Sequence, residues 1–250
     1  MTQAKLENCR IEDTVFQKVF FCNGLLSKSE AVRCVFHEAD LSGFSFIGAD
    51  LDKIIFYEID LRQTNLESEL FNQVMLIDCD MREMDFSNKR LVACQFSEGQ
   101  LQGADFTGAN VKGSVFAQCV LSDAQMDGLY AEETVFTQAT LTNASCQDAQ
   151  LNKTVWSEAV LTNADFSRSS LEYSIFERSR CEGTVFTSCN LAYANFDYAI
   201  IENANFQDAN RTHIRAHGAT GRAIGFPGNT DDVALRRAEL HSVRHKNPYF

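Results

Sequence analysis

Acidic side chains recur at a fixed interval in the first half of the chain. The segment FHEADL at 36–41 returns twenty residues later as FYEIDL at 56–61 and then as LIDCDM at 76–81. A fourth copy, FSEGQL at 96–101, keeps one acid. Carboxylates gathered in this way can bind a basic protein surface or a hard divalent cation. The set consists of Glu38, Asp40, Glu58, Asp60, Asp78, Asp80 and Glu98.

Residue types that serve in catalysis do not form a familiar motif. The sequence has no GxSxG elbow, no P-loop, no HExxH segment and no GxGxxG segment that opens a helix. His213 with His217, and His241 with His245, are spaced like metal ligands on a helix, but no third ligand accompanies either pair. We therefore expect no enzymatic activity, no cofactor and no bound metal.

The net charge of the chain limits the kinds of partner that it can bind. Residues 1–210 contain 31 acidic and 15 basic side chains, a net charge of −16, whereas residues 211–250 contain 3 and 7, a net charge of +4. DNA and anionic lipid repel such an acidic body, so it suits a basic protein partner or simply solubility. No apolar run approaches the roughly 18 residues of a membrane span, and the start MTQAKLENCR lacks the pattern of a secretory signal. We expect a cytoplasmic protein that binds neither nucleic acid nor membrane directly.

Hydrophobic residues recur at every fifth position from Leu6 to Phe206. Of these 41 positions, 37 hold Leu, Ile, Val, Met, Phe or Trp, and the position two residues earlier holds Ala, Cys, Ser, Thr, Gly or Val in 34 cases. A period of five fits neither a helix nor a plain strand. It requires the backbone to turn once in five residues while two of the five point inward. Short self-similarity of this kind is typical of a solenoid.

The repeat resembles the pentapeptide repeat family, whose consensus is A(D/N)LXX. The segments FIGADL at 46–51 and LAYANF at 191–196 match this pattern. The resemblance implies an all-β fold, a right-handed quadrilateral parallel β-helix in which four pentapeptides form one coil of twenty residues. About ten coils would then occupy residues 1–210.

A coil of twenty residues gives the acidic set a location. The acids 38, 58, 78 and 98 would stack in one column, and the acids 40, 60 and 80 in a neighbouring column around the same corner. Carboxylates about 4.8 Å apart repel one another. Three interpretations remain: a solvated corner, a surface for a basic partner, or a site for a divalent cation.

Several residues inside the repeat have a predictable role or depart from its pattern. Cysteines at small inward positions, such as Cys79 and Cys119, are predicted to be buried free thiols, because none is twenty residues from another. Trp156 replaces a phenylalanine centre and should lie in the core. Seven small positions hold larger residues, and two of these, Glu69 and Lys89, are charged and twenty apart. They predict either a paired bridge in a packing defect or an outward bulge that serves recognition.

The last forty residues leave the repeat. A glycine-rich stretch from 218 to 228 predicts a loop, and Thr230 before two aspartates predicts a helix to about residue 245. This segment would cap the last coil or join two copies. The resemblance implies the second role, because gyrase-interacting members dimerise through C-terminal segments. The residues expected to make this contact are Val233, Leu235, Leu240 and Val243.

These features predict a non-enzymatic protein-binding rod with an acidic surface. The resemblance implies a concrete partner, a type II topoisomerase, because members of the family bind DNA gyrase and topoisomerase IV as DNA mimics and some protect them from quinolones. The quinolone-resistance members of Gram-negative bacteria carry loops that project from the coils, and this chain has no such insertion. The alternative is a structural or adaptor rod in a larger assembly, whose charge serves only solubility.

Overall fold

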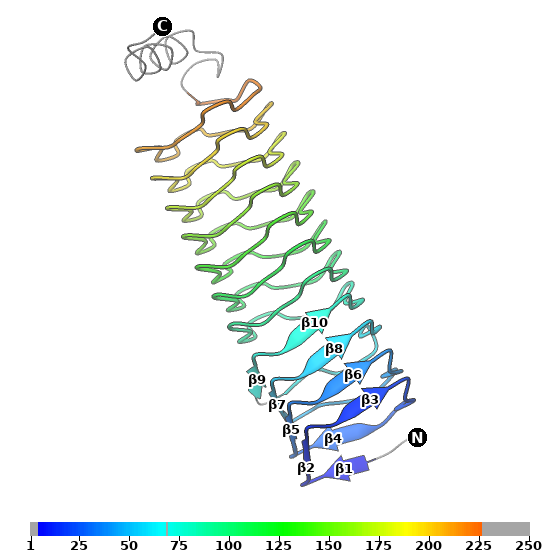
Figure 1. Cartoon of the computed structure of the whole chain (residues 1–250). Coiled ribbons are helices and arrows are strands. Elements are labelled where there is room, and N and C mark those ends of the chain that lie inside the picture. Colours follow the sequence, from blue (N-terminus) through cyan, green and yellow to red (C-terminus); the bar gives the residue numbers. More distant parts are fainter. Residues whose placement is uncertain (1–4, 69, 227–250) are drawn as a thin grey trace, which may run out of the picture.

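Backbone hydrogen bonds pair each coil with the residues twenty positions further along the chain. In the computed structural model, which describes residues 5–68 and 70–226, Val15 pairs with Val35 and Val35 pairs with Ile55, all in parallel. The chain therefore winds into stacked coils that form an elongated rod (Figure 1). The predicted parallel β-solenoid is confirmed.

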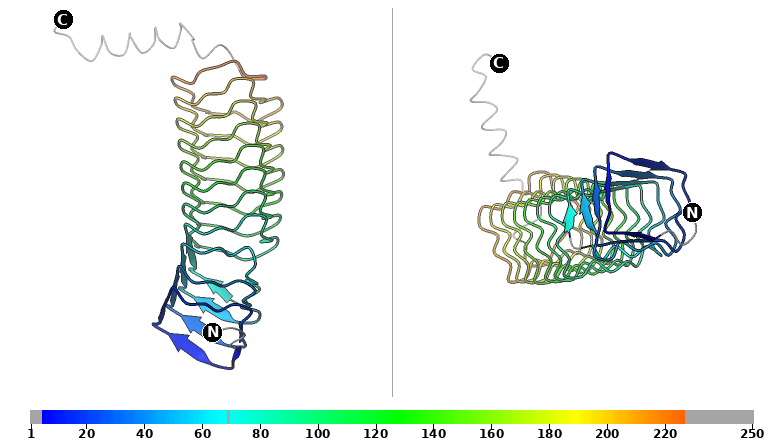
Figure 2. Two further views of the ribbon diagram at one scale, coloured as in Figure 1. Left: turned by 90° about the vertical axis from the view of Figure 1, so that its right-hand side faces the viewer. Right: turned by 90° about the horizontal axis from the view of Figure 1, so that it is seen from below.

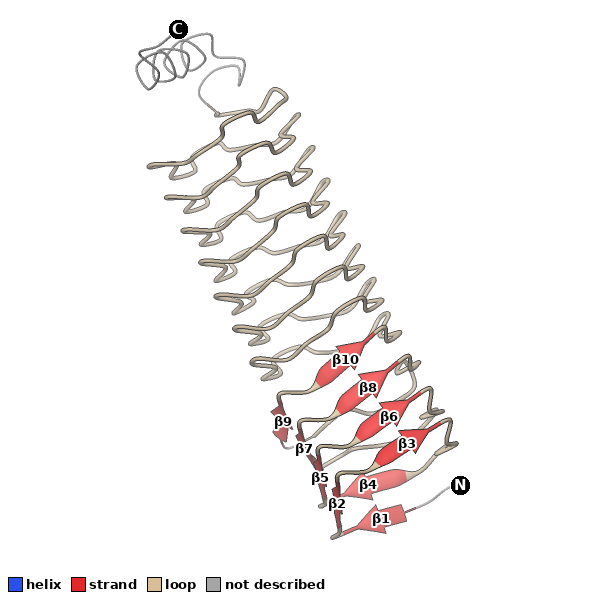
Figure 3. Ribbon diagram, in the orientation of Figure 1, coloured by secondary structure: helices blue, strands red, loops and turns tan. Residues whose placement is uncertain are grey.

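Three parallel sheets line the first part of the rod (Figure 3). Their strand orders are β1-β4, β2-β5-β7-β9 and β3-β6-β8-β10. We call the side that carries the third sheet, with its continuation from Gln95 to Arg215, the β3–β10 face. The strands are β1 (Lys5–Glu7), β2 (Arg10–Glu12), β3 (Val15–Gln17), β4 (Leu25–Ser27), β5 (Glu30–Val32), β6 (Val35–His37), β7 (Asp50–Asp52), β8 (Ile55–Tyr57), β9 (Leu70–Asn72) and β10 (Met75–Ile77).

Beyond β10 the coils continue as single bridged residues with the same offset. Gln95 bridges Val115, and Val155 bridges Ile175, both in parallel. Turns occupy the residues between successive bridges, which is why Figure 3 draws this part as loops. The named strands stack four deep at most, and the count of about ten coils stays a prediction with which these bridges agree.

Large apolar side chains stack along the axis of the rod. The rings of Phe96 and Phe116 lie 4.6 Å apart with an interplanar angle of 2°. Trp156 is fully buried, stacks on Phe136 at 4.1 Å and donates a hydrogen bond from Nε1 to Thr154 Oγ1. The five-residue period thus produces a continuous core, and the prediction that Trp156 belongs to it is confirmed.

The cysteines behave as small apolar residues. All nine are free, and seven are buried. Burial raises the pKa of Cys79 and of Cys119 to about 12. The prediction of buried free thiols is confirmed at the inward positions, except that Cys9 in the first coil is partly exposed.

Most corners of the rod hold a residue with positive φ, whereas the corners at 63 and 68 do not. Up to Gly218 the residues with positive φ have numbers that end in 3 or 8, and most are not glycine, as with Glu58 (φ 54°) and Asp78 (φ 51°). The left-handed region costs an ordinary residue about 1 kcal/mol or more. The inward residues on both sides of the corner impose the conformation, and the corner side chain itself points into solvent.

The oversized inward residues coincide with a bend. Phe44 and Ile54 are buried, whereas Met84 and Lys89 are partly exposed. The axis of the rod changes direction between the first coils, coloured blue to cyan, and the coils that follow (Figure 2). Glu69 lies outside the described residues, so its pairing with Lys89 stays a prediction.

The coil pairing continues beyond residue 210, where the sequence predicted that the repeat ends. Asn195 bridges Arg215, and Ile200 bridges Thr220. The prediction was wrong because it relied on large apolar centres, whereas positions 211, 216 and 221 hold Arg, Ala and Gly. A backbone ladder does not require large centres.

A membrane-spanning helix is not found among the described residues. The predicted helix lies outside them, as do its residues Val233, Leu235, Leu240 and Val243.

Candidate acidic interface

The seven acids lie in two columns beside the corner that follows the β3–β10 face. The backbone N–H of Glu58 donates to Ile77 O at 3.1 Å, and that of Asp78 donates to Ser97 O at 3.1 Å, so successive acids occupy successive coils. The vertical spacing is about 4.8 Å. We call Glu38, Glu58, Asp78 and Glu98 the acidic column, and Asp40, Asp60 and Asp80 the aspartate column.

The acidic column keeps most of its charge. All four side chains are exposed at corners with positive φ. Glu38 lies 3.3 Å from Lys18 Nζ and 3.2 Å from His37 Nε2. The other three members form no ion pair with any residue that the structure describes. A hydrogen bond to Glu58 raises the pKa of Tyr57. The column therefore presents stacked, uncompensated carboxylates to solvent.

Two arginines neutralise much of the aspartate column. Arg62 donates to Asp60 from Nε at 3.0 Å and from Nη2 at 2.7 Å, and Arg82 donates to Asp80 at 2.8 and 2.5 Å. Arg62 Nε also lies 3.2 Å from Asp80. These hydrogen bonds hold the pKa of Asp60 and of Asp80 below the usual value. These two partners were not predicted from the sequence, although an arginine two residues after each aspartate was the available signal.

Asp40 has a serine where the other two aspartates have arginine. The backbone N–H of Ser42 donates to Asp40 Oδ1 at 3.0 Å, and Cys22 Sγ donates to Oδ2 at 3.2 Å. Hydrogen bonds from Ser42 lower the pKa of Asp40, and the contact with Asp40 raises the pKa of the Cys22 thiol. Asp40 thus adds its charge to the acidic column.

A histidine stands beside the acidic column. His37, Glu38 and Glu58 each offer a ligand atom, and these atoms lie within 4.8 Å of one another. Nitrogen and carboxylate ligands of this kind suit zinc. However, Lys18 already pairs with Glu38, and Gln17 lies 3.4 Å from His37 Nδ1. Proximity alone does not make this set a metal site, and the expectation of no metal stays a prediction.

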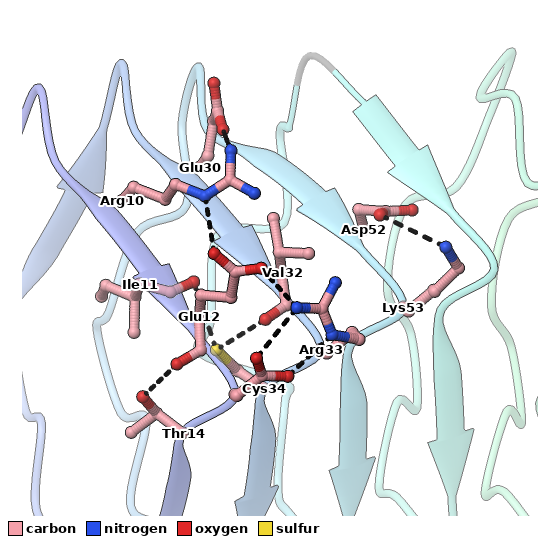
Figure 4. Close-up of polar contacts among 11 residues, drawn as sticks. Arg10, Ile11, Glu12, Thr14, Glu30, Val32, Arg33, Cys34, Asp52 and Lys53 are labelled. Atoms are coloured by element: carbon pink, nitrogen blue, oxygen red, sulfur yellow. Dashed lines mark hydrogen bonds and ion pairs between the residues drawn. The ribbon is translucent and has the colours of Figure 1, made fainter.

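A separate group of charges surrounds β2 and β5 at the start of the rod (Figure 4). Arg10 donates to Glu12 at 3.0 Å and to Glu30 at 2.7 Å, and Arg33 donates to Glu12 and to Asp13. Arginine hydrogen bonds lower the pKa of Glu12 and of Asp13. Acids and bases nearly balance here, so this group does not extend the acidic surface. The sequence pattern did not predict this group of charges.

Solved structures of similar fold come from several sources. HetL, a pentapeptide repeat protein from the cyanobacterium Nostoc sp. strain PCC 7120, is 20% identical with a TM-score of 0.38, over 88% of this chain and 90% of that chain. QnrB1, a plasmid-mediated fluoroquinolone resistance protein, is 16% identical with a TM-score of 0.32 over 98% of each chain. Rfr23 from the cyanobacterium Cyanothece 51142 is 10% identical with a TM-score of 0.34, over 59% of this chain and 91% of that chain. These likenesses concern the fold alone.

Sequence comparison places the chain among repeat proteins. No curated protein matches it. The family model for a pentapeptide repeat region matches residues 49–126, and the model for pentapeptide repeats in eight copies matches 119–155, 139–178 and 176–208. Together these matches cover more than half of the sequence. The chain belongs to the pentapeptide repeat family.

Proposed function

We propose that this protein is a non-enzymatic binding rod whose acidic column engages a basic surface of a partner protein. The observation that supports the proposal is the stack formed by Glu58, Asp78 and Glu98, three exposed carboxylates without an ion pair to any described residue. Like charges at this spacing repel and cost stability. A basic partner would relieve that repulsion.

We further propose that the partner is a type II topoisomerase and that the rod competes with DNA for binding to this enzyme. Residues 1–210 carry a net charge of −16. Carboxylates repeat about every 4.8 Å along the column, and phosphates repeat about every 3.4 Å along one DNA strand. Lys and Arg that bind phosphates also bind carboxylates. Because arginines neutralise much of the aspartate column, the acidic column would make the main contact.

Supercoiling by purified bacterial gyrase tests the proposal. The protein is titrated with and without a quinolone at two salt concentrations, beside the variant Glu58→Asn, Asp78→Asn, Glu98→Asn. Asparagine tolerates positive φ, so the triple variant should fold. We expect the wild type to inhibit supercoiling or to protect it from the drug, and the effect should fall with salt. The triple variant should lose about tenfold or more in potency.

A matched control removes as many charges elsewhere. Asp123→Asn, Asp148→Asn and Asp208→Asn also change exposed acids at corners with positive φ, and this variant should behave like the wild type. Equal loss in both triple variants would show that general charge, not the acidic column, is responsible. No effect of the wild type on gyrase would refute the topoisomerase partner. A partner that tolerates all six substitutions but requires the full length of the rod would favour the adaptor alternative.

A further inference from the structure

One face of the rod carries an apolar column on its outer side. On the β3–β10 face, the residue before each buried centre is paired coil to coil from Val15 to Ile175. Val15 is 65% exposed, Met75 38% and Ile175 36%. The polar members of this column are Gln95 and, beyond Ile175, Asn195 and Arg215. The apolar members are Val15, Val35, Ile55, Met75, Val115, Val135, Val155 and Ile175.

The equivalent positions on the other faces are mostly polar. The column that begins on β1 and β4, for example, includes Asp85, Asp105 and Asp165. Strand propensity would favour branched residues on every face alike, so it does not explain a column on one face. An apolar stripe that covers Val15 to Ile175 with one interruption, at Gln95, and that has no equal on the other faces indicates a contact surface.

At four levels, the two corners that flank this face carry opposite charges. The corner before the face and the corner after it are five residues apart in sequence. Among the residues that the structure describes, ion pairs join these corner residues to an adjacent coil, as between Lys153 and Glu133, or to a sequence neighbour, as between Lys53 and Asp52. None of these ion pairs crosses the face. The oppositely charged pairs across the face are Asp13 with Lys18, Arg33 with Glu38, Lys53 with Glu58 and Lys153 with Glu158.

The other faces lack this pattern. Among the corner positions from 8 to 218, no level of the β3–β10 face has like charges on its two corners. Across the remaining three faces taken together, one pair is opposite and two are alike. The opposite pair is Asp148 with Lys153, and the like pairs are Lys28 with Arg33 and Asp78 with Glu83. The apolar column and most of the oppositely charged corner pairs therefore occur on the same face.

We propose that two copies of this protein associate side by side through their β3–β10 faces, parallel to each other, with the two-fold axis running along the rods. Such an axis sets the corner before the face against the partner's corner after the face, at the same level. Each oppositely charged pair across one face then becomes two attractive contacts between copies. An antiparallel pair would set each corner against the same corner of the partner, so the opposite charges would no longer meet. The inference concerns self-association and does not require a topoisomerase partner.

The middle of the face differs from both ends in a way that fits this arrangement. At the corner pairs between residues 73 and 118 no opposite charges face each other, and Gln95 interrupts the apolar column. A groove of about 560 Å³ lies over these levels and extends down to Arg33 and Val35. The stretches 13–58 and 133–178 contain both apolar members of the column and oppositely charged corner pairs. They would therefore supply the contacts on either side of the groove's centre.

The face is large enough for reversible association. Eight steps of about 4.8 Å from Val15 to Ile175 give a length of about 40 Å, and three strand residues with their corner side chains give a width of about 15 Å. The contact is then about 600 Å² on each copy, near the lower end for specific interfaces. We expect an equilibrium between single rods and pairs that depends on concentration.

Charge reversal at one level tests the parallel arrangement. Lys153→Glu and Glu158→Lys are made separately, at two exposed corners that both have φ of 59°. Each variant places like charges at both contacts of that level. Sedimentation equilibrium should show self-association weakened about tenfold or more for each variant alone. An equimolar mixture should regain it, because opposite charges then meet at both contacts.

A second pair of variants distinguishes an effect on the contact face from an effect on folding. Val155→Lys lies in the apolar column and should weaken association, whereas Val185→Lys, at the equivalent outward position of another face, should not. Circular dichroism establishes that each variant is folded. A wild type that stays monomeric at about 100 µM would overturn the proposal, as would a mixture of charge variants that fails to associate. Neither Lys153 nor Glu158 belongs to the acidic column, so this result and the gyrase result are read separately.

Discussion

Single basic residues decide how much negative charge the acidic corner presents. Arg62 and Arg82 each hold the aspartate two residues earlier with two hydrogen bonds. These bonds keep the pKa of Asp60 and of Asp80 below the ordinary value of 3.8. The folded chain therefore binds protons at these sites less readily than the unfolded chain. Because the pairs are partly exposed, solvent limits their contribution to stability.

Replacing both arginines by glutamine should flatten the pH dependence of stability. A depressed folded-state pKa contributes stability above the unfolded value, and that contribution is lost as pH falls through the folded value. The wild type should lose more unfolding free energy between about pH 5 and about pH 2 than R62Q/R82Q does. Urea unfolding across this range measures the difference. Arg90→Gln, an exposed arginine without an ion pair to described residues, should follow the wild type. A steeper loss in the double variant would contradict the assignment.

Thiol reactivity should follow burial. Burial raises the pKa of Cys94 to about 11 and that of Cys79 to about 12, and thiolate is the reactive form. A neutral thiol reagent should therefore modify only Cys9 and Cys22 in the native protein, and all nine cysteines in urea. Cys22→Ser should remove one of the two accessible sites. Rapid modification of a third thiol without denaturant would show that the coils open locally.

The sequence predicted where the acids lie but not how they are paired. A strict period of twenty is sufficient to stack Glu58 on Asp78, because backbone pairing fixes the level of every residue. It does not show that Arg62 reaches both Asp60 in its own coil and Asp80 in the next. That contact depends on the path of a long side chain over the corner, which the repeat pattern does not encode.

Among the structural elements, the corner turn is the one under conformational strain. Ala93 occupies a corner with φ of 55° and is exposed. Ala93→Gly should raise the unfolding free energy by about 0.5 kcal/mol, because glycine avoids a left-handed penalty of about 1 kcal/mol or more but loses more entropy on folding. Urea unfolding followed by the fluorescence of the single tryptophan measures this. Ala104→Gly, at a buried inward position without positive φ, should instead destabilise. Equal effects at both sites would refute the argument.

The pattern of five predicts the turn but not the length of each strand. The coils up to β10 contain three-residue strands, whereas later coils, with the same spacing of large and small residues, contain single bridges. The end of the repeat was also misplaced, because Arg211 and Ala216 occupy centres that the pattern reserves for large apolar residues. Backbone hydrogen bonds continue across such positions, and a search for apolar centres does not detect them.

In the molecule as a whole, the two proposed surfaces share residues. Glu38 and Glu58 belong to the acidic column and also to the corner pairs of the β3–β10 face. A basic partner and a second copy would therefore compete for these carboxylates. Asp78 and Glu98 face no basic corner residue across the face, so they remain available to a partner in either state.

A rod built from equivalent coils should tolerate the loss of one complete coil. Each coil contacts its neighbours, so stability is close to a sum of coil and interface terms. Deleting residues 121–140 joins Val120 to Leu141 and restores the same column positions, with Phe116 facing Trp156 across the new junction. The shortened chain should unfold cooperatively, with a slightly smaller m value because less surface is exposed on unfolding.

Deleting residues 123–140 instead shifts every later residue by two positions and carries polar side chains into the core. That variant should lose more than about 2 kcal/mol of unfolding free energy. If urea unfolding followed by Trp156 fluorescence found the two deletions equally stable, the twenty-residue register would not be what holds the rod together.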